Sequence, residues 1–184
     1  MPLADSICSR LRSIARRAIR HGLAHHSAPA LLPADLAGEL GRPGAVFVTL
    51  HLHDRLRGCI GSLEPRRALA EDVNENAYAA AFEDPRFPPV TAQEEPMIEL
   101  HISRILPAEP LPCRDEAHLL NLLRPGTDGL ILQLGSRRAT FLPSVWEDLP
   151  EPGEFLRHLK AKAGLPPDFW DAGLRFFRYE TDSF

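Results

Sequence analysis

The stretch AVFVTLHLHDRLRGCIG, residues 45–61, decides the fold expected for this chain. Residues 45–50 are rich in β-branched and aromatic side chains, which favours a strand. Residues 51–55 form a polar turn, and residues 56–60 read as a second strand that returns beside the first. A strand pair that arrives as a hairpin indicates an antiparallel arrangement, because the two strands run in opposite directions.

The elements on either side of this hairpin extend the same pattern. Alternation of polar and apolar residues over 97–106 predicts a half-buried strand. We predict a second hairpin from residues 130–134 and 138–142, and a last strand over 174–180. Apolar spacing and glycine and proline punctuation predict helices that end at glycines or prolines, over residues 3–21, 34–40, 67–82, 116–123, 144–149 and 154–163. The expected fold class is α/β (α+β), with a mixed, largely antiparallel sheet flanked by helices.

Composition limits the classes of protein to consider. A chain of 184 residues with 44% hydrophobic content can bury one sizeable core, so we expect a single domain over residues 1–184. The net charge of −4 argues against a general nucleic-acid binder. No apolar run is long enough to span a membrane, and three widely spaced cysteines are typical of reduced thiols in a cytoplasmic protein.

The first 20 residues allow two interpretations. They are rich in arginine and contain a single acid, Asp5, as a mitochondrial transit peptide would. They also place Leu11, Ile14 and Ile19 on one stripe at helical spacing. We favour an amphipathic helix of the domain, because that periodicity has a direct structural meaning.

The candidate catalytic residue is Cys59. It stands between Gly58 and Gly61, and glycines permit positive φ angles and close backbone approach that would leave a thiol accessible. Arg57 precedes it, and a nearby guanidinium favours the reactive thiolate. We therefore expect Cys59 at a strand end or tight turn, facing a cleft. The alternative is a small buried apolar residue in a glycine-containing strand.

Metal and acid–base chemistry find less support. His51 and His53 share a strand face and could meet a metal with Cys59, but a polar turn with exposed histidines is the simpler account. We predict no structural zinc, and no cofactor can be assigned from the sequence, since no recognised motif is present. Glu99 and His101 could supply acid–base function, although alternation favours a solvated sheet face.

Residues 56–61, LRGCIG, resemble the signature of the AMMECR domain, the family of AmmeMemoRadiSam system protein A. The six-residue signature is specific, and the resemblance runs in order over nearly the whole chain. The further matching segments are residues 46–50, 84–87 with 89–90, 127–130, 137–143 with 145–146, 162–165, and 179–180.

This resemblance implies one compact α/β domain with a larger and a smaller lobe and a cleft between them, where the signature lies. It also implies partners, because similar proteins are often encoded beside a Memo-like protein and a radical SAM protein. Many family members carry a second cysteine where this chain has Lys160. A mechanism that requires a resolving thiol at that position is therefore doubtful here.

The family motifs add charged residues to the candidate site. Arg57, Asp84, Arg86, Arg138 and Lys162 could gather with Gly58 and Gly61 around Cys59 as an anion-binding rim. The alternative is that Asp84 pairs with an arginine only to fix its loop.

Three functions remain open at this point. The first is an enzyme or enzyme component that uses Cys59 on a small anionic or nucleotide-like substrate. The second is a noncatalytic adaptor for Memo-like and radical SAM partners. The third, an RNA- or DNA-binding module, is disfavoured by the acidic balance of the chain.

Overall fold

The computed structural model describes residues 3–184, which divide into two compact units, each with its own sheet and hydrophobic core. The first unit runs from the start of the described chain to Ile105 and also includes Asp182–Phe184. The second unit comprises Leu106–Thr181. The mixed α/β class with antiparallel sheets is confirmed. Within residues 3–184, no helix is long and apolar enough to cross a lipid bilayer.

The hairpin expected from residues 45–61 forms the middle and one edge of the first sheet. Strands β2 (Val46–Leu52) and β3 (Arg55–Gly61) are antiparallel, and β5 (Glu99–Ile105) pairs with the other side of β2. The strand order is β10-β5-β2-β3, where β10 is Thr181–Ser183. His53 and Asp54 join β2 to β3 with φ angles of 51° and 60°, the left-handed geometry that suits a two-residue hairpin turn.

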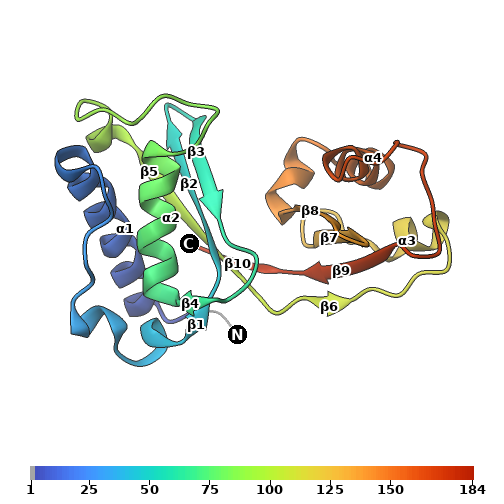
Figure 1. Cartoon of the computed structure of the whole chain (residues 1–184), viewed down its shortest axis with the longest axis horizontal. Coiled ribbons are helices and arrows are strands. Elements are labelled where there is room, and N and C mark those ends of the chain that lie inside the picture. Colours follow the sequence, from blue (N-terminus) through green and yellow to red (C-terminus); the bar gives the residue numbers. More distant parts are fainter. Residues whose placement is uncertain (1–2) are drawn as a thin grey trace. The chain divides into compact units, whose positions relative to one another are not determined.

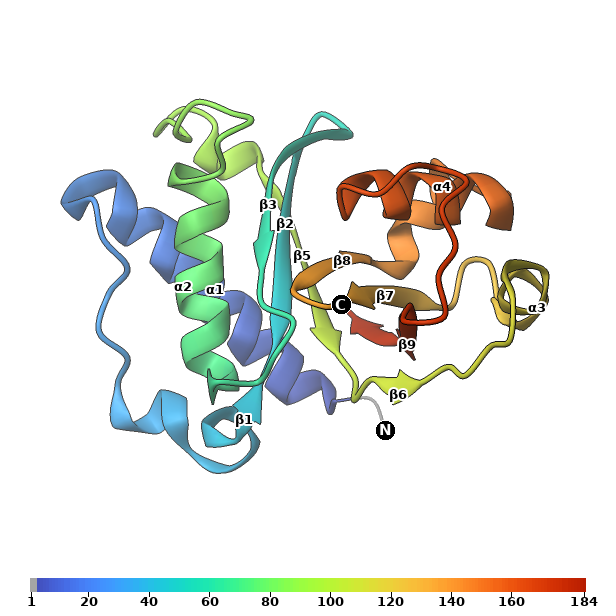
Figure 2. The ribbon, with the colours of Figure 1, turned by 45° about the vertical axis from the view of Figure 1, so that its right-hand side comes forward.

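Two long helices, α1 (Asp5–His25) and α2 (Leu69–Phe82), lie on the same face of this sheet (Figures 1 and 2). Leu11, Ile14 and Ile19 of α1 are buried in the core, so the helix interpretation is confirmed from Asp5 onward, and residues 1–2 lie outside the described residues. The strand expected from residues 45–50 is also confirmed as β2, whose buried residues Val46, Val48 and Leu50 belong to the same core.

The expected end of the first helix near Gly22 is wrong. Helix α1 continues to His25, and His26 ends it in the left-handed conformation with φ of 54°. Gly22 has a packing role instead, because a Cβ atom there would lie 2.3 Å from the ring of Phe82. The glycine lets α1 approach α2 closely.

Short elements complete the first unit. The helix expected over residues 34–40 is two 3₁₀ turns, η1 (Pro33–Leu36) and η2 (Gly38–Gly41), because Ala37 is extended and Gly38 has φ of 62°. The remaining short elements are β1 (Pro43–Gly44) paired with β4 (Arg67–Ala68), and the 3₁₀ turn η3 (Glu95–Met97).

The second unit contains a four-stranded sheet of order β6-β9-β7-β8. The expected hairpin is confirmed as β7 (Gly129–Leu134) and β8 (Arg137–Phe141), and the last expected strand is β9 (Arg175–Tyr179). The stacked rings of Trp146 and Phe155, 3.8 Å apart between centroids, lie in its core. The segment expected as a helix over residues 144–149 is a 3₁₀ turn. The other elements are β6 (Glu109–Pro110), α3 (Glu116–Leu122), η4 (Pro143–Glu147) and α4 (Pro152–Lys162).

Candidate functional site

Cys59 lies inside β3 rather than at a strand end, since the strand continues to Gly61. It pairs with Thr49 of β2, and the side chain of Cys59 is partly buried. The Thr49 hydroxyl Oγ1 lies 3.3 Å from the Cys59 Sγ atom, within hydrogen-bond distance for sulfur. The thiol is therefore neither enclosed by apolar side chains alone nor fully open to solvent.

The sheet face that carries Cys59 is opposite the face that packs against α1 and α2. Alternation along β2 directs Thr49 and His51 away from the helices, because Val48 and Leu50 point into the core. Thr49 also pairs with His101 of β5, so Cys59, Thr49 and His101 form one row across three strands. His51 and His101 contact each other edge to face, with ring centroids 5.4 Å apart. The row combines a thiol, a hydroxyl and an imidazole.

Two side chains from the loop after α2 hold the main chain of Cys59. The Cys59 N–H donates to Asp84 Oδ2 at 2.9 Å, and Arg86 Nη2 donates to the Cys59 carbonyl oxygen at 3.2 Å. Asp84 and Arg86 also form an ion pair at 2.7 Å. The structure thus brings Cys59, Asp84 and Arg86 together, as the family motifs led us to expect.

The electrostatics of this pair follow from these contacts. Asp84 is almost fully buried, and hydrogen bonds from the Arg86 side chain hold its pKa well below the ordinary value, with the Cys59 and Arg86 N–H groups adding to the effect. The hydrogen bond to Asp84 raises the pKa of Arg86 in turn. A permanent positive charge therefore lies beside the Cys59 carbonyl group.

Arg57 has a different environment from the one expected. The β2–β3 register shifts between Leu50 and His51, so Arg57 is the extra residue of a β-bulge, a local distortion that redirects a side chain. Only 8% of it is exposed. Its guanidinium binds both carboxylate oxygens of Glu94, at 2.9 and 3.1 Å, and the carbonyl oxygens of Pro88 and Pro89. These bonds fasten the loop that carries Asp84 and Arg86 to β3.

Sequence reasoning missed Glu94. Its pKa is lowered to about 2, chiefly by the hydrogen bonds from Arg57 and further by those from the Thr91 N–H and hydroxyl groups. The spacing Thr-x-x-Glu from Thr91 to Glu94 is a recognisable local capping pattern, which was the available signal.

The glycines of the signature have a packing explanation. Neither Gly58 nor Gly61 has a positive φ angle. A Cβ atom at Gly58 would lie 2.0 Å from the carbonyl oxygen of Ala80 in α2, and one at Gly61 would lie 2.3 Å from the Phe47 ring. Gly58 therefore permits close contact between β3 and α2, and the Phe47 ring covers Gly61.

Arg138 and Lys162 belong to the second unit, so their predicted grouping with Cys59 stays a prediction. Lys162 donates to the Thr140 carbonyl oxygen at 3.0 Å. Lys160 is fully buried and donates to Glu116 Oε2 at 2.7 Å. Its ammonium group has a structural role in the second unit.

The other groups considered are two cysteines and two residues of β5. Burial raises the pKa of the Cys8 and Cys113 thiols. Glu99 and His101 are exposed on β5, which fits a solvated strand face. Among residues 3–184, no group of three or more His, Cys, Asp or Glu side chains is arranged to hold a metal ion.

A model of the AMMECR1 family matches residues 12–184. The chain belongs to the AMMECR1 family. The resemblance inferred from the LRGCIG signature is therefore confirmed, and Cys59 lies on a strand of the AMMECR1 domain.

Relatives from archaea cover most of this AMMECR1-family chain. A protein from Methanothermobacter thermautotrophicus is 40% identical over 185 residues, spanning 100% of this chain and 96% of the relative. Protein MJ0810 from Methanocaldococcus jannaschii is 42% identical over 142 residues, or 75% of this chain and 71% of the relative. The crystal structure of uncharacterized protein PH0010 from Pyrococcus horikoshii matches with a TM-score of 0.89 and 32% identity, covering 98% of this chain and 92% of that one.

Proposed function

We propose that this AMMECR1-family protein is an enzyme, or a component of one, in which Cys59 acts as a nucleophile or redox group. The substrate class we propose is a small anionic or nucleotide-like molecule. The observation that carries the proposal is the contact of 3.3 Å between the Cys59 thiol and the Thr49 hydroxyl, on a strand whose main chain is fixed at Cys59.

This arrangement suits a reactive thiol for a physical reason. A thiolate needs a donor that stabilises its charge, and the Thr49 hydroxyl can rotate to donate to it. The Asp84 and Arg86 bonds hold the backbone of Cys59, which keeps the sulfur in place without further reorganisation. Arg86 pairs with the ionised Asp84 at 2.7 Å, so the two residues fix the Cys59 backbone without adding net charge to the site.

The second candidate is an adaptor subunit that presents this surface to Memo-like and radical SAM partners, which the family resemblance suggests. One observation favours it: packing against Ala80 and Phe47 explains Gly58 and Gly61 without any chemistry at Cys59. The nucleic-acid alternative gains no support from α1. Its arginines Arg17 and Arg20 pair with the acids Asp35 and Glu95 rather than forming an unneutralised basic patch.

Alkylation of the folded protein tests the first proposal. Iodoacetamide at neutral pH should modify Cys59 before Cys8 and Cys113, because burial raises the pKa of those two thiols and lowers their thiolate fraction. Mass spectrometry of time points ranks the three cysteines in one sample. Thr49→Val should slow the modification of Cys59, and Thr49→Ser should restore it, because serine keeps the hydroxyl.

The outcomes separate the two candidates. Cys59→Ser should leave the melting temperature nearly unchanged and abolish thiol-dependent activity, since a hydroxyl is a far poorer nucleophile. If Cys59 stays unmodified until the protein unfolds, the nucleophile proposal fails. Retention of partner binding by Cys59→Ser in that case would support the adaptor.

A further inference from the structure

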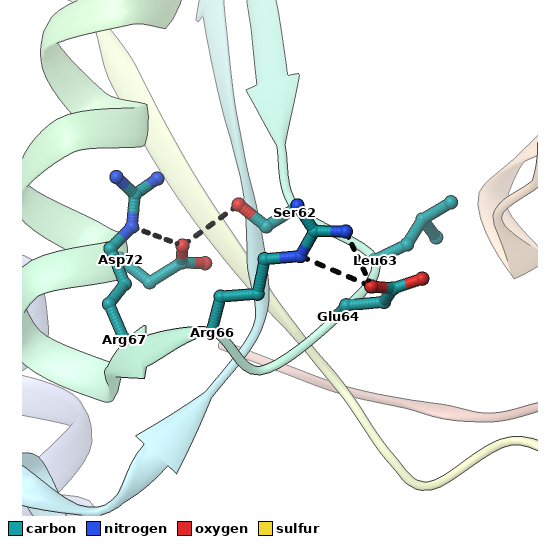
Figure 3. A pocket seen from close by; sticks show the side chains of 6 residues that line it. All are labelled: Ser62, Leu63, Glu64, Arg66, Arg67 and Asp72. Carbon is teal, nitrogen blue, oxygen red and sulfur yellow. Dashed lines mark hydrogen bonds and ion pairs between the residues drawn. The ribbon is translucent and has the colours of Figure 1, made fainter.

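A second site-like feature lies just after the C-terminal end of β3, in the loop that leads into α2. A pocket of about 540 Å³ is lined by the side chains drawn in Figure 3, which are Ser62, Leu63, Glu64, Arg66, Arg67 and Asp72. Small-molecule sites commonly have volumes of this order. The pocket contains two arginines from adjacent positions, and its chemistry is unrelated to that of Cys59.

Asp72 determines how one of these arginines is held. Its side chain is 1% exposed. Its carboxylate accepts hydrogen bonds from Arg67 Nε at 2.7 Å, Ser62 Oγ at 2.8 Å, the Val46 N–H at 2.8 Å and Asn76 Nδ2 at 3.0 Å. A buried carboxylate with four donors is fully satisfied, so it is a fixed anchor and not a ligand for a cation.

This anchor orients Arg67 and leaves some of its N–H donors unused. A guanidinium has five N–H donors in a planar fork, and only the Nε donor of Arg67 is used by Asp72. Within residues 3–184, its two terminal nitrogens have no hydrogen-bond acceptor, and 39% of the side chain is exposed. Figure 3 shows these two nitrogens turned away from Asp72. An arginine that is anchored at Nε and open at both Nη atoms is arranged to bind an oxyanion.

Arg66 supplies a second positive charge that an incoming anion can recruit. It binds Glu64 Oε2 through Nε at 3.1 Å and Nη2 at 2.8 Å. The two side chains are 83% and 44% exposed, so water screens the pair and an incoming anion can compete with Glu64. A pair of guanidinium groups should prefer a phosphate dianion to a carboxylate as its ligand, because the phosphate has more negative charge and more acceptor oxygens.

We propose that the pocket formed by Ser62, Leu63, Arg66 and Arg67 binds the phosphate group of a phosphorylated small molecule. Arg67 holds the phosphate through its two terminal nitrogens, which Figure 3 shows turned away from Arg66, and the exposed Arg66 side chain leaves Glu64 to reach a phosphate oxygen. The pocket volume of about 540 Å³ exceeds that of a phosphate, and Leu63 offers apolar surface to the rest of the ligand. This proposal is independent of the proposed role of Cys59.

Titration of the full chain with inorganic phosphate, followed by calorimetry at low ionic strength, tests the site. Arg66→Gln should weaken binding about tenfold, because one charge-assisted contact is lost. Arg67→Lys should also weaken binding, since lysine keeps the charge but loses the fork. Glu64→Gln should strengthen binding, because it releases Arg66 from its competitor. Arg55→Gln, at an exposed position of β3, is the matched control and should bind like the wild type.

The Arg66 and Glu64 variants should change the phosphate affinity in opposite directions, which makes the test decisive. Absence of saturable phosphate binding to the wild type overturns the proposal. Equal binding by all five proteins also overturns it, because phosphate would then bind elsewhere. Acetate that binds as tightly as phosphate would refute the dianion assignment. Cys59→Ser should bind phosphate normally, so the result does not depend on whether Cys59 is reactive.

Discussion

Replacement of Arg57 by methionine should destabilise the first unit through the buried Arg57–Glu94 pair. The pKa of Glu94 is lowered from 4.5 to about 2, and each pKa unit corresponds to about 1.4 kcal/mol, so the whole shift is worth at most about 3 kcal/mol. The hydrogen bonds from Arg57 are the largest cause of that shift. The carbonyl oxygens of Pro88 and Pro89 also lose a donor. We expect a total loss of about 3–5 kcal/mol at pH 7.

Part of this loss should depend on pH in a direction fixed by the lowered pKa. A carboxyl group with a depressed folded-state pKa stabilises the protein above its unfolded pKa, and the stabilisation is lost as pH falls through the folded value. For Glu94 this window lies between pH 4.5 and about 2. The difference between wild type and Arg57→Met should therefore narrow by about 1–2 kcal/mol from pH 7 to pH 3.

Urea unfolding at both pH values measures the two quantities. Arg66→Met is the matched control, because Arg66 also binds a glutamate through two nitrogens but is 83% exposed. Arg66→Met should reduce the free energy of unfolding by less than about 1 kcal/mol. The reasoning is refuted if Arg57→Met is as mild as Arg66→Met, or if its cost is the same at pH 7 and pH 3.

Three further predictions concern other contacts. Gly58→Ala should lower the melting temperature and reduce the free energy of unfolding by at least about 1–3 kcal/mol, because the new Cβ atom would lie 2.0 Å from the Ala80 carbonyl oxygen. An unchanged melting curve would contradict this. Lys160→Met should be about 2 kcal/mol more stable than Lys160→Ala in denaturant, because methionine fills the buried site and Glu116 can be hydrated; equal stability would argue against that packing role. Ultraviolet titration should show that Tyr179 ionises only near pH 12, because burial raises its pKa; ionisation near pH 10 would contradict its burial.

The main strands and long helices could be predicted because their signals are local. β-Branched and aromatic residues identified β2, alternation identified β5, and the spacing of Leu11, Ile14 and Ile19 identified α1. One error occurred where a distant residue decides the local structure. Gly22 resembles a helix end, but the Phe82 ring explains why a glycine lies inside α1.

The candidate site shows the same limit. The motifs indicated that Asp84 and Arg86 belong near Cys59, but the sequence does not reveal that they bind its main chain. Arg57 looked like a partner of the thiol, because the bulge that redirects it toward Glu94 has no sequence signal of its own. Direct contacts to Thr49 and Glu94 therefore required coordinates, since both depend on strand register and loop path.

The bonds from Asp84 and Arg86 to Cys59 also affect how the protein behaves at high concentration. Strand β3 is at the border of its sheet, where unpaired N–H and carbonyl groups offer a template for a strand from another molecule. At Cys59 both groups are already occupied by side chains, so an approaching strand finds neither a donor nor an acceptor there. Asp84 and Arg86 thus block one pairing position on the edge strand, and we expect variants that lose both side chains to aggregate more readily than the wild type.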